Sequence, residues 1–263
     1  MQKENALKIA GLSQLNKIDI KKFGCIYFGN EFCERKLPDL SFCNKIFGFC
    51  RKNSLTPVLL TPYLTDKGIS KIEPLLKSLD KSDQAFEITV NDIGLLSFLQ
   101  GNLCDNVKLN LGRLLIKMKK GPEIMSGVLN QDKEQFRQNS LQNPLFLEFY
   151  KKLGIKRFET DIPPQQADLP ENENLSLYLG NCCISSTRRC IYQNCESRDY
   201  KYSISQCNEE CLNYYIERKM LMPSSPYFIL GNAEFLRQTN PLSEKIREKA
   251  NRYVFFNSLH DLL

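Results

Sequence analysis

Short apolar runs alternate along this chain with longer amphipathic runs, and turn residues separate the two kinds of run. Apolar runs of about five residues are typical of buried strands, and amphipathic runs are typical of helices. The predicted strands are 24–28, 57–61, 86–90, 107–111, 155–159, 175–179, 227–230 and 252–256. Eight strands that alternate with helices predict one α/β domain over residues 1–263. The expected architecture is a (β/α)8 TIM-like barrel, whether complete or distorted.

The amphipathic runs place the helices and, in three cases, their first residues. We expect helices over 38–53, 68–80, 92–101, 113–120, 143–153 and 241–250. Capping or first-turn signals mark three of these starts: Asp92, Asn143 before Pro144, and Asn240 before Pro241. Helix and strand therefore alternate through most of the chain, as a barrel requires.

Two segments interrupt this alternation. Residues 121–142 are polar and follow the fourth predicted strand, so we expect an excursion with a short helix or a mobile lid. Residues 181–226 follow the sixth predicted strand, carry six cysteines and show no obvious periodicity. An insertion of this kind cannot bury a core of its own, so we expect a bound metal to order it.

The eleven cysteines allow either a secreted disulfide scaffold or an intracellular metal protein. Residues 1–22 mix charges among the apolar positions and hold no secretory signal. No stretch approaches the ~20 apolar residues that cross a bilayer. A chain of 263 residues can also bury a core without disulfides. We therefore expect a protein of the reducing cytoplasm without a membrane span.

The charge balance adds little to this picture. The chain has 36 basic and 30 acidic residues, a formal charge of +6 that is spread along its length. Such an excess tolerates nucleic acid without requiring it. The densest basic stretch is GRLLIKMKK, with Arg113, Lys117, Lys119 and Lys120. It is interpreted first as a solvated helix face, and second as a surface for phosphates or for a partner.

Four cysteines after an apolar strand have the spacing C-x6-C-x16-C-x3-C: Cys183, Cys190, Cys207 and Cys211. A fifth, Cys33, follows another predicted strand. Structural zinc sites usually present C-x2-C pairs, which this row lacks. Iron–sulfur clusters accept more irregular spacing and ligands from distant loops. The cysteine spacing alone does not favour a zinc site over an iron–sulfur cluster. Cys25, Cys43 and Cys50 are interpreted as core packing residues.

Six pieces of sequence resemble a known family when they are taken in order. They are GNEFCERKLP (29–38), EITVNDIGLL (87–96), LGRLL (111–115), RRC (188–190), CNEEC (207–211) and ILGN (229–232). Together they resemble the collagenase-like peptidase family U-32 over nearly the whole chain. The likeness is strongest to the short, single-barrel members that serve anaerobic ubiquinone biosynthesis.

The resemblance implies a four-iron four-sulfur (4Fe-4S) cluster. The ligands of the short members map onto Cys33, Cys190, Cys207 and Cys211. Other members use a C-x6-C pair, which this chain has as Cys183 and Cys190, so Cys183 is kept as the substitute for Cys33. Cys182 and Cys195 match neither pattern.

The resemblance also implies a function. It indicates a redox or accessory subunit in oxygen-independent hydroxylation of a quinone precursor or of RNA, acting with a second U-32-type protein. The alternatives are a U-32 peptidase and a non-catalytic scaffold with a structural zinc site of four cysteines. Peptidase chemistry finds little support in the sequence, because there is no G-x-S-x-G elbow and no HExxH, and the only histidine is His260.

Polar residues at the ends of the predicted strands would line the mouth of a barrel. These pocket candidates are Glu87, Asn91, Asp92, Arg113, Glu159 and Asn232, with Asp161, Arg188 and Arg189 beside them. Several have a structural alternative: Asp92 as a helix cap, Glu87 as a buried partner of Arg113, and Asn232 in a Gly-Asn turn. Arginines in such a place would offset the charge of a cluster or hold an anionic substrate.

Overall fold

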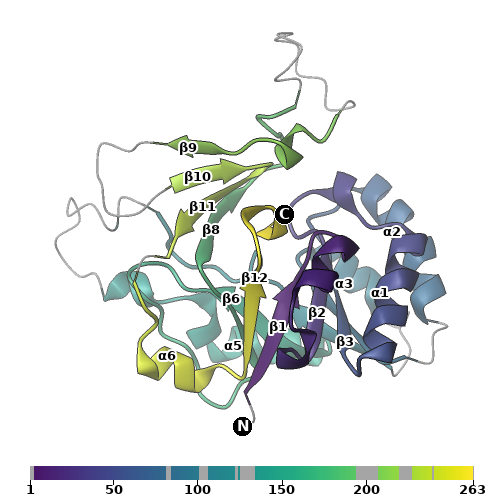
Figure 1. Cartoon of the computed structure of the whole chain (residues 1–263). Helices are drawn as coiled ribbons and strands as arrows, with labels where there is room; N and C mark the ends of the chain where they lie inside the picture. The colour runs from purple at the N-terminus through teal and green to yellow at the C-terminus, as the bar shows by residue number, and fades with distance from the viewer. Residues whose placement is uncertain are drawn as a thin grey trace.

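A closed barrel of eight parallel strands forms the body of the protein (Figure 1). The computed structural model describes residues 3–80, 84–100, 106–121, 124, 134–193, 207–218, 227–238 and 240–262. Around the barrel the order is β1-β12-β7-β6-β5-β4-β3-β2. These strands are β1 (Glu4–Lys8), β2 (Cys25–Gly29), β3 (Thr56–Leu60), β4 (Phe86–Val90), β5 (Val107–Leu111), β6 (Ile155–Asp161), β7 (Leu175–Tyr178) and β12 (Arg252–Phe256). The predicted (β/α)8 architecture is confirmed.

Helices cover the outside of this barrel. They are α1 (Leu40–Lys52), α2 (Asp66–Asp80), α3 (Ile93–Leu99), α5 (Pro144–Lys152) and α6 (Glu244–Lys249). Short 3-10 helices are η1 (Leu12–Lys17), η2 (Ile20–Lys22), η3 (Glu34–Lys36), η4 (Gln135–Arg137), η5 (Ser140–Gln142), η6 (Glu210–Leu212) and η7 (Leu259–Leu262). Cys43 and Cys50 of α1 pack in the main core between barrel and helices, as predicted.

The two faces of each barrel strand differ in chemistry. On β4, Phe86, Ile88 and Val90 belong to the main core, whereas Glu87 and Thr89 are buried polar residues on the other face. This follows from the alternation of side chains along a strand. A small apolar cluster that contains Cys25 and Tyr27 accompanies the polar residues inside the barrel. The barrel is therefore packed with side chains and has no open channel among the described residues.

A second, four-stranded sheet interrupts the barrel between β7 and β12. Its strands are β8 (Asn181–Ser186), β9 (Ile216–Arg218), β10 (Tyr227–Leu230) and β11 (Ala233–Arg237), paired antiparallel in the order β8-β11-β10-β9. Figure 1 shows it above the ends at which β1 and β12 finish. The chain leaves and returns at one point, because the backbone N–H of Gln238 donates to the Gly180 carbonyl at 2.9 Å.

Some expectations from the sequence are corrected by this topology. The strand at 227–230 exists, but it belongs to the second sheet, and the eighth barrel strand is β1, which has polar residues at both ends. The cysteine-rich excursion therefore follows the seventh barrel strand and not the sixth. It also has regular structure of its own, since its strands run from residue 181 to residue 237.

Five of the six predicted helices are present, the predicted helix at 113–120 is not, and one predicted cap is wrong. Asp92 and Asn143 cap α3 and α5, accepting hydrogen bonds from the backbone of Leu95 and Leu145 as expected. Residues 113–120 form turns and a bridge and not a helix. The last helix begins at Glu244, three residues after Pro241, so Asn240 is not its cap. The predicted lid at 121–142 is described only in part, where it contains η4 and η5.

No helix in the described part of the chain is long and apolar enough to cross a membrane. The nine cysteines that the structure describes are all free thiols.

Candidate metal centre

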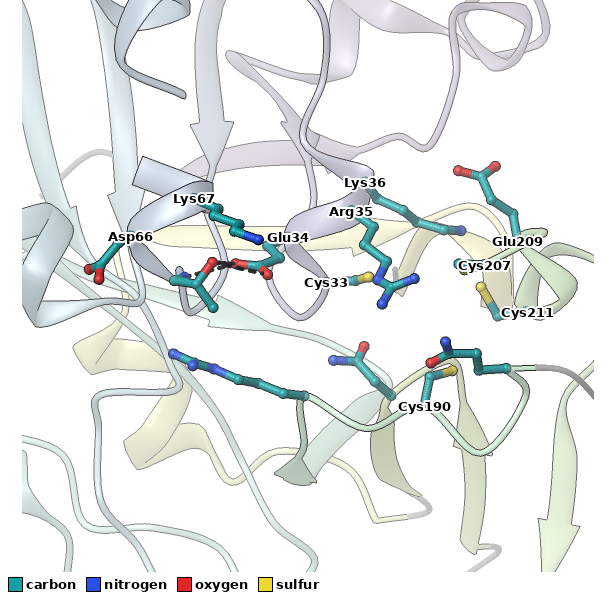
Figure 2. A pocket seen from close by; sticks show the side chains of 14 residues that line it. Cys33, Glu34, Arg35, Lys36, Asp66, Lys67, Cys190, Cys207, Glu209 and Cys211 are labelled. Atoms are coloured by element: carbon teal, nitrogen blue, oxygen red, sulfur yellow. Dashed lines mark hydrogen bonds between the residues drawn. The ribbon is translucent and has the colours of Figure 1, made fainter. Parts of the chain in front are cut away.

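Four cysteines from three separate stretches of chain line one cavity of about 920 Å³ (Figure 2). They are Cys33 after β2, Cys190 after β8, and Cys207 and Cys211 at η6. In Figure 2, Cys207 and Cys211 lie together across from Cys33, with Cys190 on a third side. Burial raises the pKa of Cys190 to about 11; the backbone N–H of Tyr192 offsets part of this rise, and the charges of Cys211, Cys33 and Cys207 add to it. The four sulfurs therefore share one electrostatic environment.

The loop that carries Cys33 is held by its own neighbours. Asn30 Oδ1 accepts hydrogen bonds from the backbone N–H groups of Phe32 at 2.9 Å and Cys33 at 2.7 Å. Such an Asx turn fixes the backbone without help from a ligand. Burial raises the pKa of the Cys33 thiol, and the backbone N–H groups of Arg35 and Lys36 offset part of that rise.

The turn that carries Cys190 is anchored on the second sheet. The Tyr192 hydroxyl donates a hydrogen bond to the Ile229 carbonyl of β10. Asn232, predicted as a pocket residue, lies in the turn between β10 and β11 and lines the same cavity. Its Nδ2 donates to the carbonyl of Phe32 at 2.7 Å and to that of Thr187 at 2.6 Å. The second sheet thus brings the late cysteine segment against the Cys33 loop.

The donor set consists of four cysteine thiols, a set that structural zinc and iron–sulfur clusters both use. Four thiolates around one zinc ion lie about 3.8 Å apart, since each Zn–S bond is about 2.3 Å. Among the described residues, no three His, Cys, Asp or Glu side chains gather closely enough to hold one metal ion. The four cysteines nevertheless line the same cavity. An iron–sulfur cubane places several atoms between its thiolates, so its four cysteines lie farther apart than the ligands of one zinc ion.

Charged side chains complete the wall of the cavity. The basic members are Arg35, Lys36, Lys67 and Arg188, and the acidic members are Glu34, Asp66 and Glu209. Glu34 is occupied by Thr65, whose backbone N–H donates to it at 2.8 Å. Thiolates that bind a metal add negative charge, so the basic members would offset charge at this place.

Cys183 lies elsewhere. It lines a separate cavity of about 240 Å³ together with Arg113 and Lys120, and burial raises its pKa to about 12. Its neighbour Cys182 is buried against Asp161, with the sulfur 3.4 Å from Oδ1. The structure therefore groups Cys33, and not Cys183, with the other three predicted ligands. Cys195 lies outside the described residues.

The remaining pocket candidates do not line the cysteine cavity. Asp92 is a helix cap whose other oxygen accepts from the backbone N–H of Leu64 at 3.2 Å. Asn91 joins β3 to β5, because it donates to the Thr61 carbonyl at 2.9 Å and accepts from Leu114 N–H at 3.1 Å. Glu159 is buried inside the barrel, where the hydroxyls of Tyr27 and Tyr178 both donate to it at 2.7 Å.

The expected pairing of Glu87 with Arg113 is wrong. Glu87 is bound by Arg252, whose two terminal nitrogens reach its oxygens at 2.6 and 2.9 Å. Burial opposes ionisation of Glu87, but the hydrogen bonds and charge of Arg252 outweigh it and lower the pKa. Glu87 lies near the start of β4 and Arg113 beyond the end of β5, so the two occupy different levels of the barrel.

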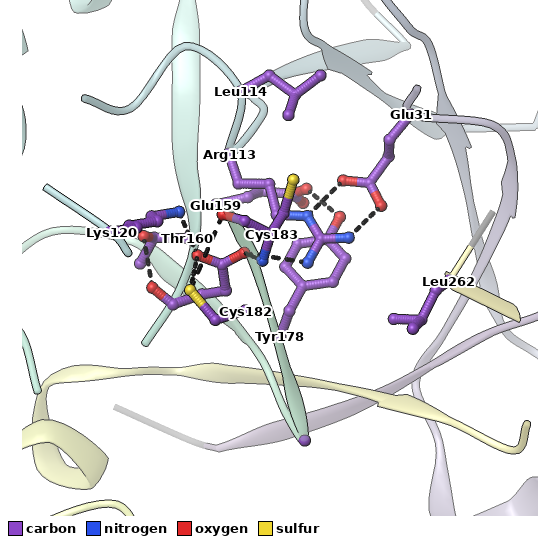
Figure 3. Close-up of polar contacts among 12 residues, drawn as sticks. Glu31, Arg113, Leu114, Lys120, Glu159, Thr160, Tyr178, Cys182, Cys183 and Leu262 are labelled. Carbon is purple, nitrogen blue, oxygen red and sulfur yellow. Dashed lines mark hydrogen bonds and ion pairs between the residues drawn. The ribbon is translucent and has the colours of Figure 1, made fainter. Parts of the chain in front are cut away.

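Arg113 instead joins a buried charge network at the end of the barrel (Figure 3). Its Nε and Nη2 donate to the two oxygens of Glu31 at 3.0 and 2.9 Å, and its Nη1 donates to Asp161 at 3.3 Å. Lys8 donates to Glu31 at 2.9 Å, and Lys120 pairs with Asp161. Burial opposes ionisation of Glu31 and Asp161, but these basic partners outweigh it and hold both pKa values below the ordinary range. The basic stretch at 113–120 is therefore not a solvated helix face.

Glu31 and Lys8 were missed by sequence reasoning. Lys8 stands in no motif, and Glu31 lies in the GNEFCERKLP piece (29–38) without being singled out there. Only the fold brings β1, the Cys33 loop and the end of β5 together. The one available signal was position, since Glu31 precedes Cys33 by two residues in a loop that follows a predicted strand.

Comparisons with known proteins are sparse. No protein-family model matches the sequence, and no curated protein matches it. Among solved structures, that of the U32 peptidase Mk0906 is similar, with a TM-score of 0.46 and 10% sequence identity over 98% of this chain and 93% of that one.

Proposed function

We propose that this chain is a distant U-32-type protein that binds a 4Fe-4S cluster through Cys33, Cys190, Cys207 and Cys211. The observation that carries the proposal is the gathering of these four cysteines, from three stretches of chain, around one cavity. The order of the six sequence pieces, which resembles that of the U-32 family, adds support for a cluster over the structural zinc site of the scaffold alternative.

The surrounding residues give the cluster a role beyond structure. The cavity is large enough to leave space beside the four cysteines, and four basic side chains lie in its wall. A bound cluster would supply one-electron redox chemistry there. The chain's own contribution is to hold the thiolates, to offset their charge, and to bind an anionic group of a quinone precursor or an RNA beside them. This is the role of a redox or accessory subunit in oxygen-independent hydroxylation.

The peptidase alternative gains no support from the buried acids. Glu31 and Asp161 are bound by basic side chains, and Glu87 is bound by Arg252. Glu159 is enclosed by two tyrosines. None of these four carboxyl groups lines the cysteine cavity, so they do not form an acid–base pair that a peptide could reach there.

A partner of the same family is part of the proposal. Exposed apolar side chains directly follow two of the four cysteines in sequence: Ile191, Leu212, Tyr214, Tyr215 and Ile216. A second U-32-type protein that covered them would also close the cavity from solvent. Mass spectrometry of the protein purified without oxygen from its native cells should identify such a partner at equal stoichiometry.

Anaerobic iron and sulfide analysis tests the cluster itself. We expect about four irons and four sulfides per chain and a brown colour. Cys33→Ala should lose most of the iron, whereas Cys183→Ala, a matched buried thiol in the other cavity, should keep it. Colourless protein with one zinc per chain would contradict the proposal. If iron were lost in Cys183→Ala but kept in Cys33→Ala, Cys183 would be the ligand in place of Cys33.

A further inference from the structure

Two side chains bridge the stretch that carries Cys33 to the stretch that carries Cys190. The outer bridge is Asn232, which donates from one nitrogen to the carbonyls of Phe32 and Thr187 at 2.7 and 2.6 Å. These carbonyls lie one residue before Cys33 and three residues before Cys190. The backbone N–H of Thr187 also donates to the Asn232 carbonyl at 2.9 Å. Asn232 therefore ties both stretches to the turn between β10 and β11.

The inner bridge is Arg113. Its guanidinium binds Glu31, two residues before Cys33, through two hydrogen bonds of 3.0 and 2.9 Å. The same group donates at 3.3 Å to Asp161, and Asp161 accepts the backbone N–H of Cys183 at 2.7 Å. Cys183 lies on β8, which leads directly to the Cys190 turn. Arg113 thus reaches both stretches through two buried carboxylates (Figure 3).

Phe32 fills the space between the two bridges. The centroid of its ring lies 5.4 Å from the centroid of the Phe235 ring of β11 and 5.2 Å from the guanidinium carbon of Arg113. It is 3% exposed. The two bridges and this packed ring hold the Cys33 loop at separate points, so the loop can neither slide nor rotate against β8 without breaking buried polar contacts.

We propose that Asn232 and Arg113 are positioning residues that set the spacing and orientation of Cys33 relative to Cys190 before any metal binds. Two bridges at different depths are needed, because a single one would fix a distance and leave the loop free to turn about it. A role in metal binding rests on the proposed function, but the two bridges hold the Cys33 loop in the metal-free protein as well.

Hydrogen exchange in iron-free protein tests the outer bridge. Asn232→Ala should speed amide exchange by about tenfold or more in both 30–36 and 187–193, since two buried hydrogen bonds are lost. Asn139→Ala is the matched control, because Asn139 also bridges two backbone carbonyls, those of Asp168 and Arg137, at 2.6 and 3.4 Å. It should leave both cysteine stretches unchanged. Unchanged exchange in Asn232→Ala would overturn the proposal.

The inner bridge is tested with Arg113→Lys and its control Arg252→Lys. Each variant replaces a buried guanidinium, which contacts a glutamate at two points, with an ammonium group. Arg252 differs from Arg113 in that it contacts neither cysteine stretch. In iron-free protein, only Arg113→Lys should speed exchange in 30–36 and 187–193. If Arg113→Lys does not fold, Glu31→Gln, which keeps the shape of the side chain, replaces it. Equal effects of the two arginine variants on these stretches would overturn the role of Arg113.

Cluster properties separate this inference from the proposed function. If wild-type protein takes up iron, Asn232→Ala and Arg113→Lys should change the reduction potential or the electron paramagnetic resonance spectrum of the bound iron, and Asn139→Ala and Arg252→Lys should not. If wild-type protein takes up no iron, the proposed function fails, yet the exchange experiment still decides whether the two bridges exist.

Discussion

At the scale of single residues, one acid inside the barrel has a raised pKa. Glu159 is completely buried and accepts two tyrosine hydroxyls, but no basic side chain forms an ion pair with it in the described part of the chain. Burial raises its pKa to about 7. Glu87, Glu31 and Asp161 differ, because Arg252, Arg113, Lys8 or Lys120 lies against each of these three buried acids.

Glu159 should make the protein less stable as pH rises. Its pKa is higher in the folded state than in the unfolded state, so the folded state binds more protons between pH about 4.5 and about 7. The free energy of unfolding then falls across this window, by roughly 3 kcal/mol at about 1.4 kcal/mol per pKa unit. Glu159→Gln cannot ionise and lacks this loss. Urea unfolding at pH 5 and pH 7.5 should show the variant gaining on the wild type at the higher pH.

Comparing the two proteins at each pH cancels the other titrating groups. Glu31 and Asp161 have lowered pKa values and contribute stability above their unfolded pKa that is lost at lower pH, in wild type and variant alike. Parallel pH profiles for wild type and Glu159→Gln would show that Glu159 does not titrate in this window.

At the scale of elements, the sequence predicted strands better than their partners. The strands β2 to β7 were found because short, mainly apolar runs bounded by turn residues are a local signal. β1 was missed because Glu4 and Lys8 lie at its ends, and the partners that bury Lys8 are distant in sequence: Glu31, 23 residues away, and the Leu262 carbonyl, 254 residues away. The run at 227–230 was correctly predicted as a strand but was assigned to the barrel and not to the second sheet. No local feature of the sequence indicates which strand pairs with it.

Helix starts were also local, and their capping contacts can be measured. Asp92→Ala should lower the free energy of unfolding by about 1–2 kcal/mol, because it removes the bond from Leu95 N–H at 2.8 Å and that from Leu64 N–H at 3.2 Å. Asn143→Ala, which loses the single cap bond from Leu145 N–H at 3.0 Å, should cost less. Denaturant unfolding measures both.

The same pair of variants separates a cap from a pocket residue. Asp92 does not line the cysteine cavity, so iron content should be equal in Asp92→Ala and Asn143→Ala. A loss of iron in Asp92→Ala alone would return Asp92 to the candidate site.

At the scale of the whole molecule, the candidate site could be foreseen only in part. Cys33, Cys190, Cys207 and Cys211 were selected by resemblance and spacing, and they do line one cavity. Glu31 and the bridging contacts of Asn232 and Arg113 could not be foreseen, because they join residues between 45 and 200 positions apart. The Glu87–Arg113 pairing failed for the same reason, since charge in a sequence does not reveal its depth in a barrel.

The second sheet should be separable from the barrel. Gly180 and Gln238 are hydrogen-bonded to each other, so a short linker between them would remove residues 181–237 without stretching β7 or β12. We expect a folded barrel with cooperative unfolding, weakened by roughly 2–4 kcal/mol because Asp161 loses the Cys183 N–H and Phe32 loses Phe235. Circular dichroism and urea unfolding measure this, and an unfolded product would show that the sheet is part of the barrel's core.

The buried network that links Lys8, Glu31, Arg113, Asp161 and Lys120 has a consequence for how this protein can vary. Substitution of one charged side chain leaves its partner buried, charged and unpaired, and this lowers the free energy of unfolding strongly. Substitutions at positions 31 and 113 should therefore be inherited together, as a neutral pair or a reversed one, while the exposed basic residues drift independently. We therefore expect correlated substitutions at these two positions in an alignment of related sequences.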